Sequence, residues 1–325
     1  MDRLLAALED DPSAADFAIS AFQSALLSYR HDSILRPFPP QYMQGEERDI
    51  SSVKSVASRL PSVVDLKKQL RNGTADPDTI DLVSWLLFDC RPSCRLRTAH
   101  LSAFKDIQKK TGRSSYAIQP SYVVELLWSE SSSLGGEGAG SQFSRLSQTH
   151  GTFYAYHGSR VENFHSILRY GLISHLNKNS LFGVGTYLST DLSVCMPYSP
   201  IGQSWTQSEL GRLMSCVAIC EVVNHPQLKS GRIQARKSEG GEMVDDKVPD
   251  KYYIVGNNEF LRVKYVLVFA DKDSKKSIKS SNRLFRMMSR HKVGTMIILY
   301  MLLLAVIGFL QSTFYMRLSR QLFPS

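Results

Sequence analysis

The segment at residues 152–172, TFYAYHGSRVENFHSILRYGL, decides the fold class. Its first eight residues have the aromatic-rich composition of a β-strand, and the part VENFHSILRYGL carries apolar residues at helical spacing. Further β-type runs are YAIQPSYVVELLW at 116–128, GTYLST at 185–190, SCVAICEVV at 215–223, YYIVG at 252–256 and RVKYVLVFA at 262–270. Short strands with helical stretches between them predict an α+β domain with a largely antiparallel sheet.

Residues 1–98 differ, because their apolar residues recur at helical spacing. The clearest runs are DRLLAALEDD at 2–11, SAADFAISAFQSALLSY at 13–29 and TIDLVSWLLFD at 79–89. Breaks that contain proline or glycine separate the helical runs at 10–12, 36–40 and 72–78. We therefore predict an all-helical domain at 1–98, followed by the α+β domain at 99–271.

The run VGTMIILYMLLLAVIGFL at 293–310 contains no charged residue. As a helix it would be roughly 27 Å long, enough to cross a thin bilayer. A basic linker at 272–292 precedes it, and a tail at 311–325 with only Arg317 and Arg320 as cations follows. Because basic flanks remain cytosolic, we expect a single-pass tail anchor with a cytosolic N-terminus and a short lumenal tail.

The net charge of +9 has its basic excess near the C-terminus. Close to an anionic leaflet, each Lys or Arg contributes about 1 kcal/mol, so the charge does not require a nucleic-acid partner. The cations of the linker are Lys272, Lys275, Lys276, Lys279, Arg283, Arg286, Arg290 and Lys292. The five cysteines fit a reducing compartment, and without nearby histidines their spacing does not favour a metal site.

Three short pieces carry chemistry: YHGSR at 156–160, LFGVGTYLSTDLSVCMPYSP at 181–200 and KYYIVGNNEFLRVKYVLV at 251–268. A histidine before a glycine at a strand end exposes an imidazole and allows a ligand to approach the backbone. Tyr187 and Tyr198 are eleven residues apart, and they could enclose a planar ring or belong to the core. These residues alone indicate a site for a nucleotide or an aromatic ligand.

Taken together and in this order, the three pieces resemble the catalytic domain of the PARP family, the diphtheria-toxin-like ADP-ribosyltransferases. The combination of HGS and, about thirty residues later, FG-x-G-x-Y carries the resemblance, which covers residues 99–271. The helical N-terminal region and the apolar run further resemble a tail-anchored mono-ADP-ribosyltransferase of the endoplasmic reticulum within this family.

The resemblance implies an NAD⁺ site with defined roles. His157 matches the histidine that bonds the adenosine ribose, and Gly158 matches the glycine whose backbone pairs with the nicotinamide carboxamide. Ser159 completes that motif. Tyr187 matches the second member of the His-Tyr-Glu triad, and Tyr198 the tyrosine that stacks on nicotinamide. A further segment, 177–184, matches the donor loop over NAD⁺.

Two departures from the family pattern stand out. The third triad position falls on Tyr252, or on Tyr253 if the register shifts by one, where polymer-forming members have glutamate. A phenol with a pKa of about 10 stays protonated at pH 7 and cannot act as that base, so transfer should stop after one unit. Cys195 stands where many members have a serine that holds the carboxamide, and a thiol is the weaker donor.

The resemblance thus implies a protein mono-ADP-ribosyltransferase with His157, Tyr187 and Tyr252 as catalytic residues, NAD⁺ as co-substrate and no metal. Expected acceptors are cytosolic domains of membrane proteins, including stress-signalling proteins of the endoplasmic reticulum, and the chain itself. The expected address is the endoplasmic reticulum membrane or nuclear envelope, with the mitochondrial outer membrane as the alternative. The alternative function is a catalytically silent scaffold that binds NAD⁺ or ADP-ribose.

Overall fold

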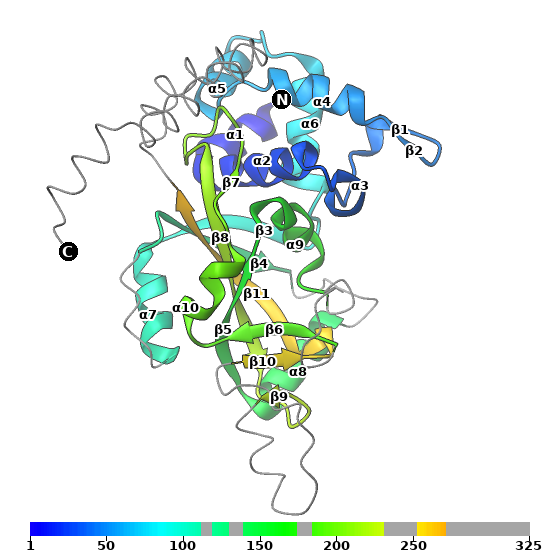
Figure 1. Ribbon diagram of the computed structural model, residues 1–325. Helices are drawn as coiled ribbons and strands as arrows, with labels where there is room; N and C mark the ends of the chain where they lie inside the picture. The colour runs from blue at the N-terminus through cyan, green and yellow to red at the C-terminus, as the bar shows by residue number, and fades with distance from the viewer. Residues whose placement is uncertain (112–118, 130–138, 174–183, 231–251, 271–325) are drawn as a thin grey trace, which may run out of the picture. The chain divides into compact units, whose positions relative to one another are not determined.

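The computed structural model describes residues 1–111, 119–129, 139–173, 184–230 and 252–270 (Figure 1). All of them belong to one structural unit, Met1–Lys272, whereas the second unit, Asp273–Ser325, lies outside the described residues. Within the described residues no helix is long and apolar enough to span a bilayer, and the expected span at 293–310 lies outside them.

Helices form the N-terminal third of the chain. They are α1 (Asp2–Asp10), α2 (Pro12–Leu27), α3 (His31–Ile34), α4 (Ile50–Arg59), α5 (Val63–Arg71) and α6 (Pro77–Ser84), with the short turns η1 (Pro40–Tyr42) and η2 (Trp85–Asp89). Side chains of Asp11, Asp49, Ser62 and Asp76 each accept a hydrogen bond from the backbone N–H three residues further on, which fixes four helix starts. Leu8, Phe22 and Leu66 are fully buried in the core that these helices share.

A short hairpin interrupts this helical region. Its strands are β1 (Met43–Gln44) and β2 (Glu47–Arg48), paired antiparallel. Gly45 begins the connecting turn with a φ of 64°, a left-handed conformation that glycine adopts without steric cost. The region expected to be all-helical therefore contains a small sheet, because the turn residue permits one.

One nine-stranded antiparallel sheet is the centre of the rest of the described chain. The strands are β3 (Cys94–Ala99), β4 (Tyr122–Trp128), β5 (Thr152–Ser159), β6 (Thr186–Ser189), β7 (Gly202–Gln203), β8 (Leu213–Val223), β9 (Lys229–Ser230), β10 (Tyr252–Val255) and β11 (Leu261–Ala270). Their order is β3-β4-β11-β8-β5-β6-β10-β9, and β7 pairs with β8. The prediction of a mixed fold with an antiparallel sheet is confirmed, and pairing with β4 places β3 in this sheet.

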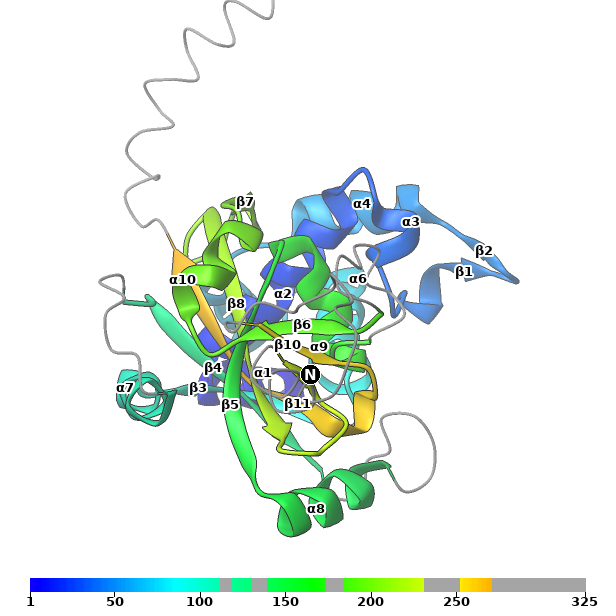
Figure 2. The same ribbon diagram turned by 60° about the horizontal axis from the view of Figure 1, so that its bottom comes forward.

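Helices cover both faces of the sheet (Figure 2). On one face, Phe104 of α7 (Leu101–Thr111) and Cys195 of α10 (Leu192–Cys195) pack with Tyr156 and Val217. On the other face lie α8 (Ala139–His150), α9 (Phe164–Tyr170) and part of α2. Short turns η3 (Val161–Asn163), η5 (Met196–Tyr198) and η6 (Asn258–Phe260) connect these elements. Because both faces are covered, β8 is buried over almost its whole length.

Candidate active site

Three neighbouring strands bring the sequence motifs together. Strand β6 lies between β5 and β10 (Figure 1). Tyr156 pairs with Ser189 across β5 and β6, and Ser189 pairs with Tyr252 across β6 and β10. Opposite residues of an antiparallel pair project to the same face, so Tyr252 shares a face with Ser189 and, by alternation, with Tyr187. The strand order therefore gathers residues that are almost one hundred positions apart.

The His157 imidazole is fixed by a neighbouring strand. Its Nδ1 lies 2.9 Å from the carbonyl oxygen of Tyr187. A carbonyl only accepts, so Nδ1 carries the proton and Nε2 is the ring's acceptor when the imidazole is neutral. Burial lowers the pKa of His157, and the hydrogen bond to Tyr187 opposes that shift only in part. The imidazole is therefore neutral at pH 7, with Nε2 able to accept from a hydroxyl.

Gly158 is required by a close backbone approach. A Cβ atom at this position would lie 2.1 Å from the carbonyl oxygen of Cys195 and 3.0 Å from Ser199 Oγ. Real Cβ atoms essentially never approach backbone so closely. Any larger residue would therefore separate β5 from the segment that carries Cys195 and Tyr198.

The Cys195 thiol lies where β5 and β6 separate, beyond their one pair at Tyr156 and Ser189. Its Sγ donates to the carbonyl of Tyr156 at 3.2 Å, and the side chain is 4% exposed. Burial raises the pKa of this thiol to about 12, although backbone N–H groups of Gly158 and Ser189 lower it. Cys195 is thus a neutral thiol that is hydrogen-bonded to the β5 backbone next to Gly158.

Two tyrosine side chains, those of Tyr198 and Tyr252, interact with one another near Cys195. Tyr198 is 59% exposed, which excludes the interpretation of Tyr198 as a core residue. It shares a hydrogen bond with Tyr252, whose pKa is raised by burial and further by Tyr198. Tyr253, the alternative third position, faces the other side of β10, where its ring lies 4.9 Å from that of Phe153.

Ser199 is a further residue beside the site that the sequence motifs did not indicate. This buried serine accepts a hydrogen bond from the backbone N–H of Ser159 at 3.1 Å. Its own carbonyl accepts from Ser215 Oγ at 2.5 Å. Asn163 donates to the Ser159 hydroxyl at 3.0 Å, so Ser159 is used within the protein. Only its position directly after Tyr198 could have drawn attention to Ser199. The predicted donor loop at 177–184 lies outside the described residues except for exposed Val184.

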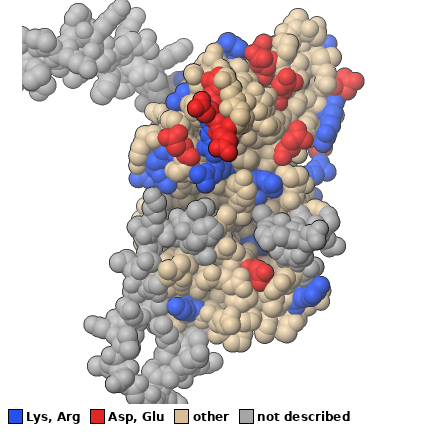
Figure 3. Space-filling view, turned by 90° about the vertical axis from the view of Figure 1, so that its right-hand side faces the viewer, with Lys and Arg blue, Asp and Glu red and all other residues tan. Residues whose placement is uncertain are grey.

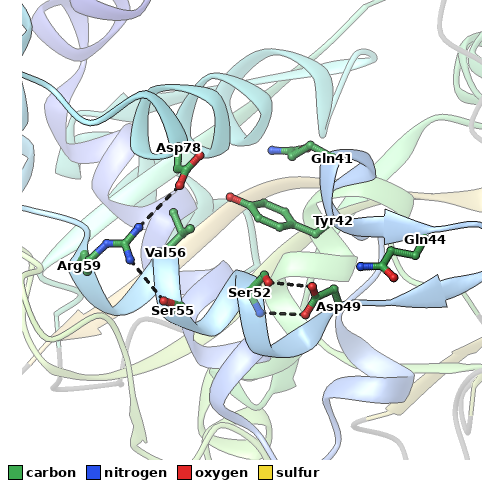
Figure 4. Close-up of a pocket in the computed structure, with 9 residues that line it drawn as sticks. All are labelled: Gln41, Tyr42, Gln44, Asp49, Ser52, Ser55, Val56, Arg59 and Asp78. Atoms are coloured by element: carbon green, nitrogen blue, oxygen red, sulfur yellow. Dashed lines mark hydrogen bonds and ion pairs between the residues drawn. The ribbon is translucent and has the colours of Figure 1, made fainter.

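A separate pocket of about 350 Å³ lies on the helical region (Figure 4). The Tyr42 ring extends over Val56 toward Asp78, while Arg59 pairs with Asp78 at 3.7 Å. Charged side chains of both signs gather over the helical elements on the face in Figure 3, and few lie over the lower part. None of the predicted NAD⁺ residues lines this pocket, so the pocket does not belong to the site on β5, β6 and β10.

The part of the chain that the structure describes includes all five cysteines, which are buried and unpaired with one another. Burial raises the pKa of Cys94 to about 12 and that of Cys216 and Cys220 above their usual value. No group of three or more His, Cys, Asp or Glu side chains within these ranges could hold a metal ion.

The neutral imidazole of His157 and the backbone of Gly158 lie on β5, and the exposed Tyr198 ring lies in the short turn η5, in the arrangement expected of an ADP-ribosyltransferase. Residues 102–239 match the model of the poly(ADP-ribose) polymerase catalytic domain, and residues 6–87 match that of the ARTD15 N-terminal domain. The chain belongs to the PARP family and is an ADP-ribosyltransferase that uses NAD⁺ as its substrate. The expected family resemblance is therefore confirmed.

Relatives of nearly the same length support this assignment. The chain is 39% identical to human protein mono-ADP-ribosyltransferase PARP16, over 93% of this chain and 92% of the relative. Identity to mouse PARP16 is 38%, over 94% and 92% of the two chains. Mouse protein mono-ADP-ribosyltransferase PARP8 is 32% identical over 29% of this chain and 15% of its own length. The catalytic-domain match ends before Tyr252, so that position depends on strand register instead.

Proposed function

We propose that the chain transfers a single ADP-ribose from NAD⁺ to protein side chains and releases nicotinamide. The observation that carries this proposal is the register that sets Tyr252, not a carboxylate, beside Ser189 and within hydrogen-bond reach of Tyr198. Burial and the Tyr198 contact raise the Tyr252 pKa, so the phenol remains protonated at pH 7. A protonated phenol can hold a ribose hydroxyl but cannot activate that hydroxyl to start a second unit.

His157 and Gly158 would hold the donor. The neutral Nε2 of His157 suits a hydroxyl of the adenosine ribose, because Nδ1 already donates to Tyr187. The backbone of Gly158 lies beyond the single pair of β5 with β6, where a carboxamide could take the place of a strand partner. The exposed Tyr198 ring offers an aromatic face for stacking.

Cys195 would regulate how firmly nicotinamide is held. In the structure its Sγ is bonded to Tyr156 and lies within reach of the Gly158 N–H. A carboxamide that pairs with Gly158 must therefore share or displace this thiol. A thiol is a weak donor, so we expect weaker retention of nicotinamide than a serine would give.

Bond cleavage needs little covalent help from these residues. Loss of nicotinamide produces an oxocarbenium-like transition state at the ribose, as in glycoside hydrolysis. Fixing both riboses and the pyridinium ring lowers the entropic part of the barrier. An acidic acceptor side chain is already nucleophilic at pH 7, so we propose Asp or Glu acceptors, including residues of the chain itself.

The test is incubation of the full chain with labelled NAD⁺. We expect label on wild-type protein that is released as monomeric ADP-ribose, and little label on His157→Ala or Tyr187→Ala. The exposed His100, whose imidazole hydrogen-bonds to Ser102, gives the matched control His100→Ala with normal labelling. NAD⁺-dependent thermal stabilisation without any label would support the silent scaffold instead, and long ladders would exclude a single-unit product.

We further propose a division into a helical domain (1–98), a catalytic domain (99–271) and a basic linker (272–292), then a membrane helix (293–310) with a lumenal tail (311–325). The uncharged run and its basic upstream flank support an anchor in the endoplasmic reticulum membrane with a cytosolic catalytic domain. The sequence Asn-Gly-Thr at 72–74 is a natural glycosylation sequon. With this topology, a sequon added after Ser325 should be used, whereas the one at Asn72 should not. Glycosylation at Asn72 would reverse this topology.

Tethering raises the local concentration of other proteins on the same membrane. We therefore propose that cytosolic domains of endoplasmic reticulum proteins, stress-signalling proteins among them, are preferred acceptors. Deletion of residues 293–325 should lower their modification in cells while the purified chain keeps its transfer activity. Unchanged cellular modification would contradict a role for the anchor in target choice.

A further inference from the structure

Helix α2 contributes side chains to both cores. Phe17 and Ala21 belong to the core beside the sheet, whereas Phe22 belongs to the helical core. In the opposite direction, Trp205, from the segment between Tyr198 and β8, is 2% exposed within the helical core. The helical region and this segment therefore share one packed interior.

Asp16 of α2 makes the most specific contact of this interface. Its carboxylate is 1% exposed and accepts from Ser208 Oγ at 2.5 Å and from the backbone N–H of Glu209 at 2.7 Å. A third hydrogen bond comes from Ser20 Oγ within α2 at 3.1 Å. A buried carboxylate is costly unless donors surround it, so these donors fix where residues 208–209 can lie.

The segment that α2 binds, residues 203–212, is a loop whose two ends are hydrogen-bonded to each other. Ser204 pairs with the far end of the segment through its backbone N–H to the Arg212 carbonyl at 2.9 Å and its hydroxyl to the Gly211 carbonyl at 2.7 Å. A second bond from α2 joins Ser24 Oγ to the carbonyl of Gln203. Helix α2 thus holds residues 203–212 at two points: Ser24 binds the start of the segment, and Asp16 binds near its middle, at residues 208–209.

This closed segment follows the proposed nicotinamide site directly. Only four residues separate Tyr198 from Gln203 in the sequence. At its near end, Ser199 is bonded to Ser159 and Ser215. Gly202 allows close contact with Val161, since an added Cβ would lie 2.6 Å from that side chain. Tyr198 therefore precedes a segment that is hydrogen-bonded to β5 at its near end, through Ser199, and to α2 further on.

We propose that Asp16, through Ser208, is a positioning residue that holds the segment after Tyr198 and so sets the nicotinamide end of the NAD⁺ site. This inference rests on the proposed function, because it assigns Tyr198 to nicotinamide. It gives the helical region a mechanical part in catalysis. Loss of the Asp16–Ser208 bond would let Tyr198 move and weaken donor binding, while leaving the reacting groups themselves intact.

The test compares Ser208→Ala with Ser20→Ala in the full chain in detergent. Each variant removes one hydroxyl donor from the same buried carboxylate. Of these two hydroxyls, only that of Ser208 joins α2 to the segment, where it also accepts from the backbone N–H groups of Leu210 and Gly211. We expect Ser208→Ala to raise the KM for NAD⁺ about five- to tenfold with kcat within about twofold, and Ser20→Ala to leave KM within about twofold. Ser24→Ala, which removes the second bond, should change KM in the same direction as Ser208→Ala.

Hydrogen–deuterium exchange gives a readout that does not depend on activity. Amides of residues 198–211 should exchange faster in Ser208→Ala than in Ser20→Ala. Equal effects of Ser208→Ala and Ser20→Ala on KM and on exchange would overturn the inference. Unchanged KM and exchange in both Ser208→Ala and Ser24→Ala would also overturn it. If Ser208→Ala exchanges faster than Ser20→Ala but the wild-type chain transfers no ADP-ribose, the proposed function fails while the positioning role of Asp16 remains.

Discussion

Gly158 and Cys195 lie so close that a Cβ on Gly158 would be 2.1 Å from the Cys195 carbonyl oxygen. This contact holds β5 against the segment that carries Tyr198, and it requires no ligand. Glycine at this position therefore has two reasons to be present: the backbone approach within the protein and the proposed carboxamide contact. The requirement within the protein can be measured separately from the ligand.

Gly158→Ala should lower the free energy of unfolding by about 1–3 kcal/mol, because the new methyl group meets backbone atoms that cannot rotate away. Transfer activity should fall at least about tenfold, since Tyr198 would be displaced. Gly256→Ala is the matched control, because its added Cβ would meet nothing closer than 3.9 Å. Denaturant titration and labelled-NAD⁺ transfer measure the two effects, and equal tolerance of both substitutions would contradict this account.

Cys195→Ser should strengthen inhibition by nicotinamide about three- to tenfold, because a hydroxyl is a better donor than a thiol at the fork of β5 and β6. The same hydroxyl can keep the bond to the Tyr156 carbonyl. Cys195→Ala offers no donor and should not tighten inhibition. Product-inhibition curves for the three proteins give the comparison, and tighter inhibition with alanine would show that space, not donor strength, decides.

Tyr252→Phe should raise the KM for NAD⁺ about two- to tenfold, since it removes the hydroxyl that bonds to Tyr198. Tyr253→Phe keeps the ring packing against Phe153 and should leave KM unchanged. Steady-state kinetics of these neighbouring variants decide which tyrosine takes the third triad position. A larger effect of Tyr253→Phe would show that Tyr253, and not Tyr252, takes the third triad position.

His165 should make stability depend on pH. The ring is fully buried against Phe22, and burial lowers its pKa from 6.5 to about 4, with a smaller contribution from the Arg91 charge. The unfolded chain then binds a proton more readily, so stability rises as pH increases through this window and is lost as pH falls toward 4. The shift corresponds to about 3 kcal/mol. The bond from Nε2 to the Pro37 carbonyl, 2.7 Å, persists only in the folded state.

Denaturation of the full chain between pH 4 and pH 6.5 measures this slope. His165→Gln should flatten it, whereas the exposed His100→Gln should leave it as in the wild type. An identical slope in wild type and His165→Gln would assign the acid sensitivity to other groups.

Strand positions were largely predictable from the sequence. The run TFYAYHGS coincides with β5, and YYIV coincides with β10, because aromatic and β-branched residues leave few other conformations. Cys216, Ala218 and Cys220 alternate along β8, the spacing typical of one strand face, and all three lie in the same core. The opposite face of β8 is also buried, which alternation alone does not reveal.

The long-range contacts could not be predicted in this way. Nothing in the sequence near Asp16 indicates a partner almost two hundred residues away, and Trp205 has no local signal for the helical core. Strand β3 was not expected, and most of it falls within the stretch assigned to helices. Its alternating Arg95 and Arg97 are exposed, so the run lacks the apolar composition of a buried strand, although β3 lies at the edge of the sheet. Spacing in the sequence identified Tyr187 and Tyr198, but only register separates Tyr252 from Tyr253.

The most direct test of the account is a crystal structure of the chain with a benzamide-type mimic of nicotinamide. The carboxamide should hydrogen-bond to the Gly158 backbone, the ring should stack on Tyr198, and the Cys195 thiol should have moved or share the contact. Binding of the mimic in the pocket around Tyr42 and Asp78, with the space beside Gly158 still closed by Cys195, would contradict it.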